Sequence, residues 1–323
     1  MRRSATLFLV GIMVMLMHPF VLVAQDDGAG IVMTSTLIEN PSVAGIEGYG
    51  VLRFSYKNIY PGNKYKLNKM FLTYDSYFEG LHGGASFFIS NDSKAGMIND
   101  LHTGLSYAYH FKAGDDFYIS AGLSASLFHR GFNFANAVLP DQIDSYGNVS
   151  LVSGETLVDK NVTVPDVSTG FLFMFKNYYV GLAMSHLTQP DLSGDHSETT
   201  ILSRSILLHA GGTIPINNDI KIDPVLAAKY DDKHLIVSGG IALGIQKLST
   251  NAIVSYENSG CLDLRAGLSF DFESFGFNYA YKFNILNDNK MLPVSVHHQI
   301  GISVVLNNLK KRKAIHTITI PKI

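Results

Sequence analysis

Residues 117–127 read FYISAGLSASL, and this short stretch decides the fold of the chain. From Ile119 to Leu127 every second residue is apolar, and the residues between them are serines and a glycine. Successive side chains of a β-strand point to opposite faces, so this period predicts a strand with one apolar and one polar face. The same period returns in three later segments, at 264–272, 275–283 and 299–306.

The composition indicates that the apolar faces of these strands meet lipid. Only 16% of the 323 residues are charged and the mean hydropathy is +0.14, whereas a soluble domain is about a quarter charged. After the N-terminal region no run is long and uncharged enough for a spanning helix. Apolar residues dispersed over alternating strands are typical of a membrane β-barrel. A soluble secreted β-sandwich is the alternative, and the single Cys261 excludes an internal disulfide in it.

Fourteen segments have the length and the pattern of a strand. The sequence therefore predicts an all-β fold, a transmembrane antiparallel β-barrel of about 14 strands, with 12 or 16 as alternatives. The predicted strands are 49–57, 67–77, 81–90, 101–112, 116–128, 167–175, 178–186, 203–213, 220–230, 233–245, 249–257, 260–270, 274–284 and 294–306.

The connections between these segments fall into two sets. Every second connection is short, as expected for the periplasmic turns of a barrel, and an even strand number then places both termini in the periplasm. The other set contains the predicted extracellular loops 58–66, 91–100, 129–166, 187–202 and 285–293. Many inward positions are Gly, Ser or Ala, which leaves room in the lumen. That room could hold water or an inserted loop, and loop 129–166 is long enough to plug it.

The two ends of the chain are expected to lie outside the barrel. Residues 1–24 have the pattern of a signal peptide, with two arginines, an apolar stretch and a small residue at the cleavage site. The barrel then spans 25–306, and localisation in the bacterial outer membrane follows. The tail, 307–323, contains five basic residues and no acidic one. It is either a solvated end or a contact for a periplasmic partner.

The chain lacks the common catalytic and metal-binding motifs. It has no Gly-x-Ser-x-Gly elbow, His-Glu-x-x-His motif or phosphate-binding glycine loop. His297 and His298 are adjacent on a predicted strand, so they face opposite sides and cannot bind one metal ion together. The acidic segment 195–198 could hold a divalent cation, but a solvated loop explains it equally well. We therefore predict a non-enzymatic protein with no cofactor, no metal and no nucleic-acid partner.

Short motifs near both ends of the chain are similar to those of a known family. Asn40-Pro41-Ser42-Val43-Ala44-Gly45 is close to an NPAxAG opening, and Leu292-Pro293-Val294-Ser295 with His298-Gln299 is close to an LPxSxHE passage. Together they resemble the PorP/SprF family of outer-membrane proteins from Bacteroidetes. Gln299 departs from the expected acid, and the chain has no Trp. The family-motif residues are Asn40, Pro41, Gly45, Arg53, Pro293 and His298.

The resemblance implies a role in protein secretion. Members of this family belong to the type IX secretion and gliding machinery, and they support export and surface anchoring of adhesin-type proteins. The implied partners are outer-membrane lipid, a secreted cargo protein and other secretion-system components, including periplasmic ones. The residues alone leave a second function open, a passive porin or a channel for hydrophobic solutes.

One predicted loop carries aromatic residues that a polar extracellular loop rarely exposes. Loop 129–166 contains Phe132, Phe134 and Tyr146. They either pack inward as a lid over the lumen or, together with loop 187–202, form the surface that binds a secreted partner. These three residues are the candidate partner-binding residues.

Overall fold

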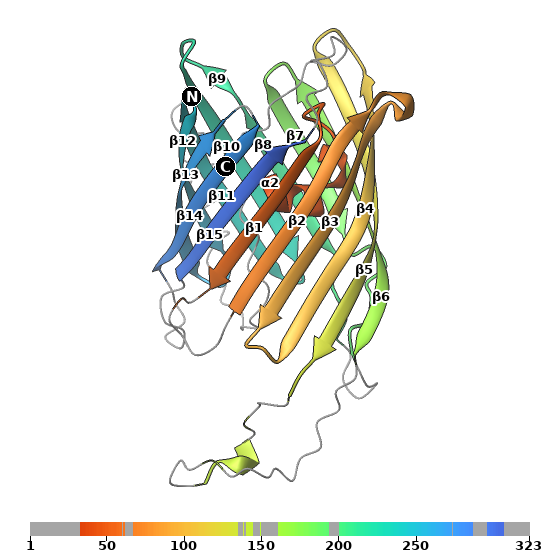
Figure 1. Cartoon of the computed structure of the whole chain (residues 1–323), viewed down its shortest axis with the longest axis vertical. Helices are drawn as coiled ribbons and strands as arrows, with labels where there is room; N and C mark the ends of the chain where they lie inside the picture. Colours follow the sequence, from red (N-terminus) through yellow and green to blue (C-terminus); the bar gives the residue numbers. More distant parts are fainter. Residues whose placement is uncertain are drawn as a thin grey trace, which may run out of the picture.

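The computed structural model describes residues 33–59, 61, 67–134, 138, 140–144, 149, 161–193, 200–272, 274–286 and 296–306. Within them, one antiparallel sheet closes into a barrel (Figure 1). Strands that follow one another in the sequence are neighbours around the sheet. The last strand, β15 (Val296–Val305), pairs with the first, β1 (Val51–Ile59), and so closes the barrel.

The other strands run up and down the wall between these two. They are β2 (Leu67–Phe78), β3 (Gly83–Lys94), β4 (Ile98–Lys112), β5 (Phe117–Phe132), β6 (Val162–Phe175), β7 (Tyr178–Ser185), β8 (Ser205–Gly212), β9 (Ile214–Pro215), β10 (Ile220–Asp231), β11 (His234–Ile245), β12 (Leu248–Glu257), β13 (Cys261–Asp271) and β14 (Phe275–Leu286). β9 has two residues and pairs with β10 just beyond β8, so the pair counts as one wall position. The barrel has fourteen such positions, which confirms the predicted fold class and strand number.

The part of the chain that the structure describes also contains four short helical elements. They are α2 (Met33–Glu39), η1 (Pro41–Val43), η2 (Glu79–Leu81) and η3 (Pro140–Gln142). Among the described residues, no helix is long and apolar enough to span a membrane.

Exposure along the strands confirms the predicted alternation. On β5, the side chain of Leu123 is 61% exposed, whereas Ser124 is 4% exposed. Leu268 and Phe270 on β13 are likewise exposed, and Ser269 between them is buried. The outer face therefore carries apolar side chains that suit lipid, and the inner face carries small and polar ones.

The two ends of the barrel differ in their connections. We call the end where β1 begins and β15 ends the short-turn end, because the connections there are brief. Long connections lie at the opposite, long-loop end, at 60–66, 133–161, 186–204 and 287–295. The prediction of a loop at 91–100 is wrong. Its polar residues continue the ladder between β3 and β4, and only the turn 95–97 joins the two strands.

The longest loop does not plug the barrel with its described residues. η3 and the bridge between Ile143 and Val149 lie well beyond the ends of β5 and β6, in the yellow-green segment of Figure 1. Ile143 and Val149 are exposed there. These residues therefore do not plug the lumen. A segment that precedes the first strand occupies the lumen instead.

Candidate functional site: the plugged lumen

Residues 33–50, which we call the plug segment, lie inside the barrel (Figure 1). α2 contacts β1, β2 and β7, and η1 contacts β4, β5 and β6. Apolar side chains of the segment, including Leu37 and Val43, form a buried cluster with wall residues such as Leu172 and Tyr179. The lumen therefore holds a small hydrophobic core, which ties the segment to the wall.

Asn40 organises the centre of the plug segment. It is the N-cap of η1, and its Oδ1 accepts hydrogen bonds from the Ser42 nitrogen at 3.1 Å and the Ser42 hydroxyl at 2.6 Å. Pro41 follows at the first helical position, where its missing N–H costs nothing. The Asn40 amide nitrogen lies 2.8 Å from Nε2 of His209 on β8. One fully buried side chain thus caps the helix and binds the wall.

Wall side chains also bind the backbone of the plug segment. The hydroxyl of Ser120 on β5 donates to the Ser42 carbonyl oxygen at 2.6 Å. His110 Nε2 on β4 lies 3.0 Å from the Ala44 carbonyl oxygen. These contacts satisfy buried carbonyls that a segment outside regular structure would otherwise leave unpaired.

Three glycines of the wall make room for this segment. A Cβ atom built on Gly84 would lie 1.9 Å from the Ala44 oxygen, and one built on Gly170 would lie 2.1 Å from Asn40 Oδ1. Gly122 on β5 faces the segment in the same way. A larger residue at these positions would occupy the space that the segment fills. The wall and the plug segment are therefore shaped for each other.

A buried ion triad fixes the end of the plug segment to the first two strands. Arg53 on β1 binds Glu47 of the segment, with NH2 2.5 Å from Oε1, and also binds Asp75 on β2. All three side chains are less than a tenth exposed. Asp75 accepts a further hydrogen bond from the Gly45 nitrogen at 2.9 Å. Burial, and then the nearby Glu47, raise the pKa of the Tyr49 phenol, so it keeps its proton.

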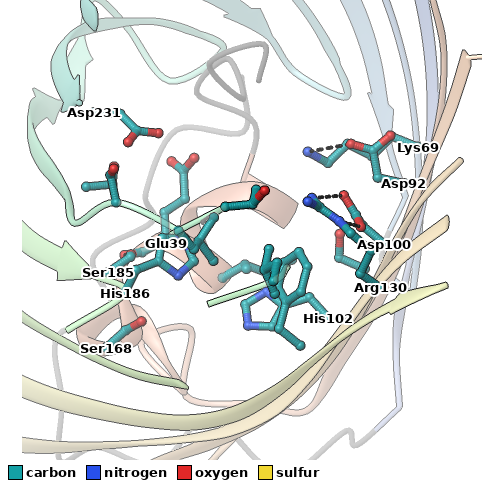
Figure 2. Close-up of a pocket in the computed structure, with 18 of the residues that line it drawn as sticks. Glu39, Lys69, Asp92, Asp100, His102, Arg130, Ser168, Ser185, His186 and Asp231 are labelled. Carbon is teal, nitrogen blue, oxygen red and sulfur yellow. Dashed lines mark hydrogen bonds and ion pairs between the residues drawn. The ribbon is translucent and has the colours of Figure 1, made fainter. Parts of the chain in front are cut away.

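A cavity of about 250 Å³ lies on the long-loop side of the plug segment (Figure 2). Ile38 and Glu39 line its inner end. One wall comes from β2 to β5, and the other comes from β6 to β8 and β10. All of these strands contribute residues from the part of the strand nearer the long-loop end. We call this space the vestibule.

Charged side chains of both signs line the vestibule. On the β2–β5 wall, Arg130 donates to both oxygens of Asp100, at 2.7 and 2.8 Å, and Lys94 Nζ lies 3.2 Å from the same carboxylate. Lys69 and Asp92 form a looser pair at 3.7 Å, drawn beside Asp100 in Figure 2. Among the described lining residues, this wall has three cations and two carboxylates.

The opposite side of the vestibule, with Glu39 of the plug segment included, has more carboxylates than lysines. Lys229 Nζ on β10 lies 3.0 Å from Glu39 Oε1, and the Asp231 carboxylate points into the vestibule in Figure 2. Counted together with Glu39 of the plug segment, the described lining residues on this side include two carboxylates and one lysine, besides His186. The vestibule is thus dipolar, with an extra positive charge on one side and an extra negative charge on the other.

A histidine cluster holds the loop after β7 against the wall. His186 Nδ1 lies 2.7 Å from Asp166 Oδ2, and Thr188 donates to Asp166 Oδ1 at 2.8 Å. His102 lies nearby and contacts the Ser126 hydroxyl at 2.9 Å. The described residues include no group of three or more His, Cys, Asp or Glu side chains placed to hold a metal ion. The contacts of His186 and Thr188 with Asp166 attach the loop after β7 to β6.

The structure places two of the three candidate partner-binding residues at the mouth of the vestibule. Phe132 and Phe134 stack with ring centroids 5.7 Å apart at the end of β5. Phe132 is on the same strand face as Phe128 and Arg130, which both line the vestibule. Described residues of loop 187–202, including the buried Leu192, also line it. Tyr146 lies outside the described residues.

The family-motif residues separate into two groups. Asn40, Pro41, Gly45 and Arg53 come together in and around the plug segment, an arrangement that the sequence did not predict. His298 is on the outer face of β15, where its Nδ1 lies 2.7 Å from the Tyr279 hydroxyl. His297 is buried on the inner face, as the alternation predicted. Pro293, like residues 1–24 and the tail 307–323, lies outside the described residues.

Comparison with known families agrees with the family resemblance of the sequence. The sequence profile of the family described as type IX secretion system membrane protein PorP/SprF matches residues 24–319. The chain belongs to the PorP/SprF family. Its barrel is accordingly an outer-membrane barrel, and the family indicates that it works with other components of the type IX secretion system.

Comparison with solved structures finds outer-membrane channels. The CymD monoaromatic hydrocarbon channel has a TM-score of 0.53 and 10% identity, over 88% of this chain and 95% of that one. The Pseudomonas putida toluene transporter TodX has a TM-score of 0.49 and 12% identity, over 85% and 94%. At 10% identity the likeness to CymD shows the fold alone. A search of curated proteins found no match. The family and fold resemble secretion-system membrane proteins and barrel channels rather than enzymes.

Proposed function

We propose that this PorP/SprF protein is a non-enzymatic, plugged barrel that supports export of adhesin-type proteins and anchors them at the cell surface. The observation that carries the proposal is the plug segment. Its central residues Asn40, Ser42 and Ala44 have no exposed surface inside the lumen. A barrel whose interior is packed in this way suits a docking platform better than an open pore.

The proposal includes an orientation in the membrane. β1 begins and β15 ends at the short-turn end, and short turns are typical of the periplasmic side of bacterial barrels. Both termini would then be periplasmic, and the long loops would face the outside. The basic tail would lie where periplasmic components of the machinery can reach it.

The long-loop end supplies the proposed docking surface for the secreted partner. It consists of Phe132, Phe134 and Tyr146 with loop 187–202. Loops on a rigid scaffold often carry binding residues, and aromatic residues are enriched where proteins bind one another. The described pair, Phe132 and Phe134, lies beside the charged vestibule, so apolar and polar contacts are available together.

Deletion of residues 140–160 tests this proposal. The barrel should still assemble and shift its gel mobility on heating, because the described part of this loop lies away from the wall, but retention of the partner at the cell surface should be lost. Replacing Phe132 and Phe134 with alanine should also lower retention. The matched control replaces the stacked pair Phe272 and Phe275, whose ring centroids are 6.5 Å apart at the short-turn end. Retention that survives the deletion would place the docking site elsewhere.

A passive porin or a channel for hydrophobic solutes is the second candidate, because the similar solved barrels are channels. The plug segment weighs against it. Conductance of the purified protein in planar bilayers separates the two functions. Large, steady openings would support the porin.

A further inference from the structure

We infer that the inner wall of the barrel binds a small oxyanion, a carboxylate or phosphate compound from solution, between Arg265 on β13 and Lys282 on β14. These two strands are neighbours in the wall (Figure 1). The site is separate from the vestibule, because none of the described residues that line the vestibule belongs to β12, β13 or β14. The inference does not depend on the proposed anchoring function.

Arg265 carries a buried charge that the described part of the chain leaves unpaired. Its side chain is on the inner face of β13 and is 8% exposed, whereas its neighbour Ala266 is on the outer face. No described residue forms a hydrogen bond or an ion pair with its guanidinium group. A guanidinium group stays protonated in proteins, and an unpaired buried charge is costly. The side chain therefore favours the binding of an anion that the wall itself does not supply.

The residue directly opposite Arg265 on β14 is a second cation, Lys282. Opposite residues of an antiparallel pair have their Cβ atoms about 4.5–5.5 Å apart, and like charges placed there repel each other. Asp263, two positions before Arg265 on the same face, does not bind both cations. One of its oxygens lies 2.6 Å from Lys282 Nζ, and the other accepts a hydrogen bond from Asn284 at 2.7 Å. The three charged groups therefore keep one positive charge in excess.

The wall next to Arg265 on the other side has small residues and an amide. Gly267 follows Arg265 on the inner face, and it pairs with Asn251 on β12 and with Ala280 on β14. A Cβ atom built on Gly267 would lie 2.7 Å from Asn251 Nδ2, so the Asn251 side chain lies over this glycine. Asn251 is 6% exposed, and its Oδ1 has no hydrogen-bond partner among the described residues. Its amide nitrogen is thus a further donor beside Arg265.

These groups suit an oxyanion better than a halide ion. A guanidinium group donates two parallel N–H···O bonds to two oxygens of one carboxylate or phosphate group, and such charge-assisted pairs are strong. Chloride is a single atom and cannot accept this pair of bonds in the same way. The bound oxyanion would also lie between Arg265 and Lys282 and would reduce the repulsion between them.

Thermal unfolding of the purified, full-length barrel in detergent tests the inference. At constant ionic strength, chloride is replaced by inorganic phosphate or by acetate. The midpoint temperature of the unmodified protein should rise with oxyanion concentration, by about 2–4 °C once the site is mostly occupied. Arg265→Gln should lose this rise. A rise with phosphate alone identifies a phosphate compound as the ligand, and a rise with acetate alone identifies a carboxylate.

Lys112→Gln is the matched control, because Lys112 is an exposed cation at the short-turn end. It should keep the full rise, and comparison with it removes the general stabilisation that phosphate gives to folded proteins. The absence of a rise in the unmodified protein overturns the inference. An equal rise in Arg265→Gln and Lys112→Gln does the same.

Stability in chloride alone gives a second readout. Arg265→Gln should unfold at the same temperature as the unmodified protein or higher, because it removes an unpaired buried charge. Lys282→Gln should unfold at a lower temperature, because it leaves the Asp263 carboxylate without its cation. A clearly lower midpoint for Arg265→Gln in chloride would show that Arg265 already has a partner in the wall, and it would overturn the inference.

Discussion

Gly122 on β5 faces Ser42 of the plug segment so closely that a Cβ atom built on Gly122 would lie 2.3 Å from the Ser42 nitrogen. Both partners in this contact are backbone, so neither can rotate away as a side chain would. The plug segment and the barrel wall can keep this distance only while residue 122 is glycine. The contact therefore links one glycine of the wall directly to the closure of the lumen.

Gly122→Val should displace the plug segment from an otherwise intact barrel. The valine side chain would overlap Ser42, whereas the strand itself tolerates β-branched residues well. We expect a heat-modifiable barrel with larger conductance in planar bilayers than the unmodified protein. Gly131→Val is the control, because the nearest atom to a Cβ there is 3.7 Å away. An assembled Gly122→Val barrel that conducts no more than the unmodified protein would show that this contact does not hold the plug.

Arg53→Met should destabilise the barrel strongly. It leaves the carboxylates of Glu47 and Asp75 buried together without their shared cation. Removing one partner of a buried ion pair costs about 3–5 kcal/mol. The midpoint of unfolding in detergent should therefore fall at a lower urea concentration. Lys112→Met is the control, because its pair with Asp115 is exposed. Recovery of stability in the triple variant with Glu47→Gln and Asp75→Asn would support the electrostatic cause, and its absence would point to packing.

A charged substitution on the outer face should cost more stability near the middle of the membrane than near its surface. Leu123 is in the part of β5 that crosses the membrane, so Leu123→Arg should cost about 2–4 kcal/mol. Ile216, also exposed, lies in the turn after β9 near the membrane surface, and Ile216→Arg should cost about 0–1 kcal/mol. Unfolding from lipid vesicles measures both. Similar costs at the two positions would contradict the lipid assignment of Leu123.

The sequence predicted the wall well because each strand carries its own signal. The alternation in β5 is visible without any neighbour, and the predicted strand ends differ from the observed ones by a few residues. The segment 91–94 was misread because its polar residues resemble a loop. In the structure, Asp92 and Lys94 point into the lumen, where each pairs with an opposite charge, so polarity there marks the inner face.

The plug segment could not be predicted from periodicity, because it has no regular period and depends on contacts far along the chain. Asn40 meets His209, which is 169 residues away. The motif at residues 40–45 indicates a family, but it does not indicate where the segment lies in the fold. Glycines at inner positions, such as Gly84 and Gly122, are the sequence feature that points to the plug segment. A glycine inside a strand often marks a close approach of another backbone.

Asn40→Ala should loosen the plug segment more than the small size of the Asn40 side chain implies. It removes the N-cap acceptor for Ser42 and leaves His209 without its partner inside the lumen. Loss of a cap costs about 0.5–2 kcal/mol, and each buried group left unpaired adds about 1–3 kcal/mol. The midpoint temperature of thermal unfolding in detergent should therefore fall clearly.

Asn217→Ala is the matched control for this change. Asn217 Oδ1 also accepts two hydrogen bonds in a local turn, from the nitrogens of Asp219 at 2.9 Å and Ile220 at 2.8 Å, but it lies exposed at the short-turn end. Water can replace the lost acceptor there, so the shift should be much smaller. Equal shifts for the two alanine variants would mean that Asn40 acts only as a helix cap, and that its contact with the barrel wall adds nothing to the closure of the lumen.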